Sequence, residues 1–166
     1  MTTLETFSLP FDFSKMKKAA DLIYENGTLL ALYLSENDYY LFLWADCNET
    51  FNRWMIFRTT LKDLSSYIYG KMPLYDLVVN NPDGFVRFAD YSGQGKFPSE
   101  TLSLPVKKIP EDYLPDEDSY FEFEITDEIK NVISPKNYKI SVPEKEQSLF
   151  FTLMDKLGWK STAAVW

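Results

Sequence analysis

The sequence predicts a single α+β domain whose centre is a twisted, mainly antiparallel sheet of five to seven strands. Its 166 residues suit one domain and suffice for a self-contained core. Apolar residues make up 45% of the chain and aromatic residues 17%, and aromatic side chains favour strands. The turn signals between successive apolar segments are close together, which indicates strands joined as an antiparallel meander.

The first half of the chain predicts most of this sheet. A proline interrupts the first residues, 1–13, so we expect an irregular or short extended arm there. The Asn26-Gly27 pair supplies the positive φ that a tight hairpin needs. The third predicted strand is apolar at nearly every position, which favours a central place in the sheet. The four strands predicted in this half are residues 19–24, 28–34, 39–45 and 53–58.

Two short helices are expected after the fourth predicted strand. Thr60 is a suitable N-cap with an acidic residue three positions later, and Gly70 suits the end of that helix. Pro73 can open the second helix, over residues 73–79. Two further strands are predicted at residues 85–91 and 101–109, with a glycine-containing loop between them.

The last third of the chain predicts a further strand, a helix start and a C-terminal helix. Phe121, Phe123 and Ile125 alternate with polar residues, which is typical of a half-buried strand over residues 120–125. Residues 126–128 read as a helix start, and residues 143–157 have the apolar spacing of a C-terminal helix that docks on the sheet. We treat residues 1–166 as one domain, with Ser134-Pro135 as the boundary of a possible C-terminal appendage, residues 135–166.

The negative charge lies in one segment, residues 111–128, which we call the acidic segment. It holds nine of the 25 acidic residues and no Lys or Arg, which leaves 16 acidic against 17 basic residues elsewhere. One interpretation is a solvated loop that serves solubility, and the other is a surface for a basic protein partner, a cation or the mimicry of nucleic-acid charge. Direct nucleic-acid binding is disfavoured because no basic footprint is present. The candidate binding residues are Asp112, Asp116, Glu117, Asp118, Glu122 and Glu124.

The chain contains no histidine and one cysteine, Cys47. The commonest general base, the commonest metal ligand and the orienting member of nucleophile triads are therefore missing. We predict no cofactor and no metal site, and the composition favours a protein without enzymatic activity. No apolar stretch approaches the ~20 residues that cross a bilayer, and the first ten residues lack a signal peptide, so we expect a cytoplasmic protein that does not bind membranes.

One pattern supports an enzymatic alternative. Pro115-Asp116 followed by Glu128-Ile129-Lys130 resembles the signature of restriction-endonuclease-like nucleases, where two carboxylates hold a divalent metal and a lysine polarises water. A metal-dependent hydrolase would use Asp116, Glu128 and Lys130 as its catalytic residues. It would require these side chains to converge, with a strand at Glu128.

Between about Asp21 and Glu122 the order of motifs resembles an uncharacterised family of small bacterial proteins, a domain of unknown function. The most specific block is Ile109-Pro110-Glu111-Asp112-Tyr113-Leu114-Pro115, preceded by Tyr40-Leu41-Phe42-Leu43-Trp44 and Met72-Pro73-Leu74-Tyr75-Asp76. The resemblance implies a bacterial cytoplasmic protein with an α+β fold, and it carries no catalytic residue or cofactor over to this chain.

Three hypotheses of function follow. The first is a bacterial protein-binding or regulatory domain that uses the acidic segment against another protein with a basic surface. The second is the metal-dependent hydrolase. The third is a structural subunit of a homo-oligomer whose excess of aromatic residues covers an interface, for which exposed Trp or Tyr clusters would be the sign.

Overall fold

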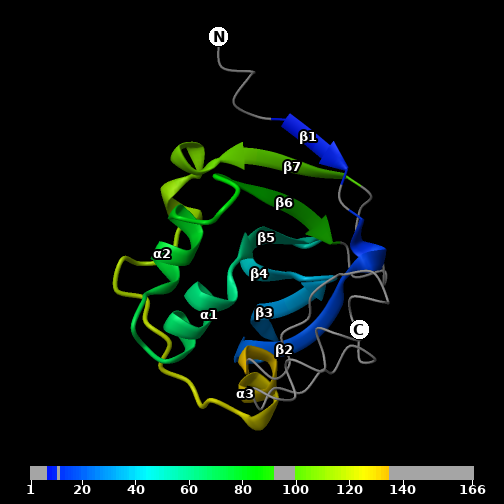
Figure 1. The fold of residues 1–166 in the computed structure, drawn as a ribbon. Coiled ribbons are helices and arrows are strands. Elements are labelled where there is room, and N and C mark those ends of the chain that lie inside the picture. Colours follow the sequence, from blue (N-terminus) through cyan, green and yellow to red (C-terminus); the bar gives the residue numbers. More distant parts are fainter. Residues whose placement is uncertain (1–6, 11, 92–99, 135–166) are drawn as a thin grey trace.

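The computed structural model describes residues 7–10, 12–91 and 100–134. These residues form one seven-stranded sheet, whose arrangement is shown in Figure 1. The strand order is β1-β7-β6-β5-β4-β3-β2, and all six pairings are antiparallel. The predicted α+β meander is therefore confirmed. The strands are β1 (Phe7–Pro10), β2 (Lys17–Tyr24), β3 (Thr28–Ser35), β4 (Asp38–Cys47), β5 (Asn52–Thr59), β6 (Phe85–Tyr91) and β7 (Glu100–Pro105).

The turns between the first strands follow the predicted chemistry. Asn26 has φ 56° and Gly27 has φ 137°, so the β2–β3 hairpin uses the left-handed region that this dipeptide favours. Glu36 takes φ 55° in the next turn. β4 lies inside the sheet, and both Leu41 and Phe42 are buried although they face opposite sides. A strand buried on both faces needs apolar residues at consecutive positions, which is why its alternation is weak.

The first strand lies at the opposite edge of the sheet from the second. Seven residue steps connect Pro10 to Lys17, a reach of at most ~25 Å, and the 3-10 helix η2 (Phe13–Lys15) shortens it further. A flat sheet would separate its two edges by six strand spacings, about 29 Å. Phe13 and Met16 in this link pack against a buried cluster of Ala31, Phe42, Ile56 and Ala89. The sheet is therefore bent toward the face that carries this cluster, which we call the Phe42 face.

Three helices cover the other face of the sheet, which we call the helix face (Figure 1). α1 (Leu61–Ile68) begins at Thr60, whose Oγ1 accepts a hydrogen bond from the Asp63 amide at 3.1 Å. α2 (Leu74–Val79) follows Pro73, and α3 (Asp127–Ile133) begins at Thr126, whose Oγ1 accepts from the Ile129 amide at 3.2 Å. The predicted cap at Thr60 is thus present, and Thr126 caps the helix whose start was predicted at residues 126–128. The side chains that the helices bury on the sheet are Leu64, Tyr67, Ile68, Leu74, Leu77, Val78, Ile129 and Ile133.

Two strand predictions are corrected by the structure. Residues 120–125 form no strand. Just before them, the amides of Leu74 and Tyr75 donate to the carbonyl oxygen and Oγ of Ser119 at 2.9 and 3.1 Å, which ties Ser119 to the start of α2. Phe121 is buried, but Phe123 is 41% exposed, so the alternation does not mark one buried face. The strand predicted over residues 101–109 ends at Pro105, and the 3-10 helix η3 (Val106–Lys108) follows. The helix predicted over residues 143–157 and the appendage 135–166 lie outside the described residues.

Tyr67 provides a test of the core on the helix face. Its side chain is 1% exposed, and burial raises the pKa of its phenol well above the ordinary value of 10. The unfolded chain therefore ionises first, so the free energy of unfolding falls as pH rises above about 10. We expect Tyr67→Phe to reduce this loss by up to about 1.4 kcal/mol per pH unit, measured by urea unfolding between about pH 8 and 11.

The control is Tyr69→Phe, since Tyr69 is 55% exposed at the end of α1. The pKa of Tyr33 and of Tyr40 is also raised by burial, so the pH dependence decreases in Tyr67→Phe without vanishing. Parallel curves for Tyr67→Phe and the parent protein would show that this phenol is not protected in solution.

Candidate functional site

The acidic segment runs along the outside of α2 and α1 before it enters α3, as the yellow trace in Figure 1 shows. All nine of its acidic side chains are exposed. Among the candidate binding residues, Asp112 lies in the 3-10 helix η4 (Glu111–Tyr113). The other five lie between η4 and α3: Asp116, Glu117, Asp118, Glu122 and Glu124. The structure thus places all six predicted residues on one exposed stretch.

No carboxylate of the acidic segment forms an ion pair with a Lys or Arg of the described part of the chain. The ion pairs there join Lys18 to Asp21, Arg53 to Asp90, and Arg58 to Asp38 and Asp83. None of them uses a residue of the acidic segment. Over the same residues, no group of three or more potential ligands is arranged to hold a metal ion. The segment is therefore a row of solvated negative charges.

The backbone of the acidic segment is nevertheless held in place. Ile109 lies just before it and is buried, Phe121 is buried within it, and Ile129 is buried just after it. Phe121 packs edge-on against Tyr67 of α1, with ring centroids 5.4 Å apart. The hydrogen bonds from the start of α2 to Ser119 fix the middle of the segment. The carboxylates are thus displayed from a fixed backbone, with the exposed aromatic rings of Tyr120 and Phe123 among them.

A hydrogen-bonded network fixes the start of the acidic segment to the sheet. Arg53 on β5 makes two hydrogen bonds to Asp90 on β6, at 2.8 and 3.0 Å. Its Nη1 donates to the hydroxyl of Tyr113 at 3.0 Å, and that hydroxyl donates to Asp46 Oδ2 on β4 at 3.0 Å. The hydrogen bonds to Asp90 raise the pKa of Arg53, so this guanidinium stays charged. No sequence pattern indicates this network, because its hydrogen-bonded partners are 37 to 67 residues apart and only the fold brings them together.

The hydrolase hypothesis required a strand at Glu128, and the structure has a helix there. Glu128 and Lys130 both lie on α3, two residues apart. Side chains at that spacing point to different sides of a helix. Asp116 lies in the irregular stretch before Ser119. The arrangement that this hypothesis needed is therefore absent at Glu128.

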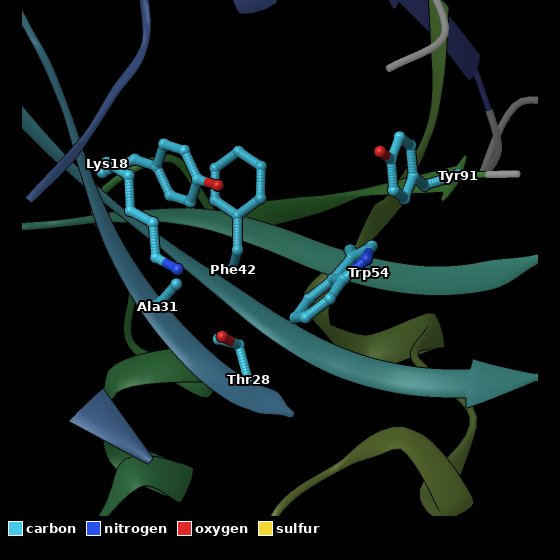
Figure 2. A pocket seen from close by; sticks show the side chains of 7 residues that line it. Lys18, Thr28, Ala31, Phe42, Trp54 and Tyr91 are labelled. Carbon is cyan, nitrogen blue, oxygen red and sulfur yellow. The ribbon is translucent and has the colours of Figure 1, made fainter. Parts of the chain in front are cut away.

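A pocket of about 230 Å³ lies on the Phe42 face, away from the acidic segment (Figure 2). Its described lining comes from five neighbouring strands, β2 to β6, because the sheet bends toward this side. Lys18 and Thr28 lie on one side of the opening, and Trp54 and Tyr91 lie on the other. Ala31, Tyr33 and Phe42 complete the lining. No sequence motif predicts this pocket, because its described lining residues come from five different strands.

Exposed aromatic and other large apolar side chains are spread over several elements. They are Tyr24, Trp44, Tyr69, Leu102, Tyr120 and Phe123, and among the described residues only the last two share an element of chain, the acidic segment. No helix of the described residues has the length and apolar character that crossing a membrane requires.

Comparison with family models, with curated proteins and with solved structures finds no match to this chain. The resemblance to a family of small bacterial proteins therefore stays a prediction.

Tyr113→Phe tests whether the network holds the acidic segment. The change removes a hydroxyl that bonds a cation and a carboxylate at once. We expect the free energy of unfolding to fall by about 1–2 kcal/mol. We also expect faster hydrogen exchange at the Leu114 amide, which is bonded to Glu111 within the segment. The control is Tyr120→Phe, whose ring is 45% exposed. Equal exchange in both variants would show that the network does not order this segment.

Proposed function

We propose that this protein is a non-enzymatic binding module that engages a basic surface of another protein through the acidic segment. The observation that carries this proposal is a row of nine exposed carboxylates without ion-pair partners among the described residues, displayed from a backbone anchored in the core. A solvated loop that serves only solubility does not need buried anchors at Ile109, Phe121 and Ile129. A binding surface benefits from them, because a preordered segment loses less conformational entropy on association.

Charge complementarity explains why the partner would be basic. Like charges held close together repel, and a surface rich in Lys or Arg relieves that repulsion while steering the encounter. Tyr120 and Phe123 would supply the apolar contact that charged residues alone do not give, since aromatic side chains dominate binding energy at interfaces. The resemblance to small bacterial proteins supports a bacterial cytoplasmic setting for this interaction, and the absence of histidine supports a role without catalysis.

The first test is affinity capture from the lysate of the host with three baits, compared by quantitative mass spectrometry. The first bait is the parent protein, and the second carries Asp116→Asn, Glu117→Gln and Asp118→Asn. The third is matched for charge and carries Glu25→Gln, Glu36→Gln and Glu49→Gln, three exposed carboxylates outside the segment. We expect the parent and the third bait to retain a stoichiometric basic protein that the second bait loses.

Salt provides a second arm of this test. The Debye length shortens from about 10 Å at 0.1 M salt to about 3 Å at 1 M, so retention should fall steeply over that range. If all three baits retain a partner equally, the acidic segment is not the surface that binds it. A partner lost with both substituted baits would mean that total charge, rather than this surface, decides binding.

Phe123→Ala tests the apolar part of the proposed surface. Phe123 is 41% exposed and touches the buried Phe121 ring, with centroids 5.7 Å apart, so its truncation should leave the fold intact. We expect affinity for the captured partner to fall about tenfold or more, as for a modest hot spot. Tyr24→Ala is the control, because Tyr24 is 64% exposed on β2 and outside the acidic segment. Surface plasmon resonance with the purified partner measures both, and equal affinities would exclude Phe123 from the interface.

A further inference from the structure

The pocket on the Phe42 face has a polar end built from three side chains of β2 and β3. Lys18 Nζ lies 2.6 Å from Asp21 Oδ1, and the Thr28 hydroxyl donates to the same oxygen at 2.7 Å. Asp21 is not among the described residues that line the pocket, whereas Lys18 and Thr28 are. Asp21 therefore acts from beside the opening and positions both of them. The Lys18 ammonium keeps two further N–H groups for another acceptor.

The opposite end of the pocket is aromatic. Trp54 from β5 and Tyr91 from β6 stand across the opening from Lys18 and Thr28 (Figure 2). Tyr33 and Phe42 stack on each other with ring centroids 4.1 Å apart, so they form a closed surface and do not themselves bracket a ligand. Aromatic rings pack best against other flat rings, in offset or edge-on contact. This end of the pocket suits a planar apolar group.

The polar groups that line the pocket are mostly donors. Lys18 and Trp54 can only donate, and the hydroxyls of Tyr33 and Tyr91 can donate as well as accept. Thr28 uses its proton on Asp21 and offers an acceptor. Lys18 is the one charged side chain among the described residues that line the pocket. A ligand that complements this set brings acceptors and a negative charge.

We propose that this pocket binds a small planar aromatic carboxylate, with its ring against Trp54 and Tyr91 and its carboxylate at Lys18. The cavity of about 230 Å³ lies below the size of most drug-sized sites, which limits the ligand to one or two rings. A single lysine that already shares its charge with Asp21 suits one carboxylate and not a phosphate ester with its higher charge. The same lysine repels an organic cation, so the aromatic walls do not act as a cage for an ammonium ligand. The proposal is independent of the acidic segment.

Four probes of matched size or charge test the proposal on the full-length protein: benzoate, benzamide, benzylammonium and acetate. We expect benzoate to bind with a Kd of about 0.1–1 mM, as suits so small a ligand, and benzamide about tenfold more weakly. Benzylammonium and acetate should bind more weakly still. Isothermal titration calorimetry measures the affinities, and the shift of the Trp54 indole N–H signal in a ¹⁵N–¹H spectrum locates the ligand.

Two variants separate a specific site from a nonspecific apolar surface. Lys18→Met should weaken benzoate about tenfold and leave benzamide unchanged, whereas the matched control Lys62→Met, on α1, should change neither. Asp21→Asn should strengthen benzoate binding several-fold, because it frees the Lys18 charge while the amide oxygen still accepts from Thr28. A gain of affinity cannot result from damage to the fold.

Any of four results would overturn the proposal. The first is no benzoate binding at about 10 mM in the parent protein, ten times the weakest Kd expected. The second is benzylammonium binding as tightly as benzoate, and the third is equal benzoate affinity in Lys18→Met and Lys62→Met. If Asp21→Asn weakens benzoate while circular dichroism shows an unchanged fold, Lys18 is not the carboxylate ligand and the proposal fails as well.

Discussion

The short link between β1 and β2 constrains the whole sheet. It has to connect opposite edges of a seven-stranded sheet with seven residue steps, and a flat sheet is too wide for that. The bend that results turns the Phe42 face inward, so that Phe13 and Met16 of the link reach the buried cluster of that face. The same bend brings residues of five strands around one pocket. Without it, Lys18 near one edge of the sheet and Tyr91 on β6 would lie too far apart to line one small cavity.

The helix face of the sheet is covered by helices and not by a link between strands. α1, α2 and α3 bury one apolar stripe each, and the acidic segment connects α2's surroundings to α3 across the outside of the helices (Figure 1). Phe121 is its buried anchor, whereas its charged side chains and the rings of Tyr120 and Phe123 are exposed to solvent. Burying any of these carboxylates without a cation would be costly. The exposed negative row is therefore a consequence of how the segment is anchored, and it is also the property that the proposed partner would recognise.

Much of this fold was predictable because its signals are local. The Asn26-Gly27 turn and the caps at Thr60 and Thr126 each depend on neighbours within a few residues, and all three are present. The alternation at Phe121 and Phe123 was misleading, since a strand also needs a partner strand and no described strand pairs with residues 120–125. The acidic row was visible in the sequence, but its anchoring was not. The Arg53 network and the pocket depend on which residues of distant strands stand side by side, and composition and spacing carry no information about that register.

The register of β5 and β6 couples the two faces of the sheet. Arg53 and Asp90 pair on the helix face, where they hold Tyr113 and the start of the acidic segment. Their chain neighbours Trp54 and Tyr91 point to the Phe42 face and line the pocket. Because successive side chains of a strand alternate between faces, a one-residue slip of either strand would move the two named side chains of that strand to the wrong side. The Arg53–Asp90 ion pair therefore depends on the same register that sets Trp54 and Tyr91 at the pocket, and through Arg53 this register also reaches Tyr113 at the start of the acidic segment.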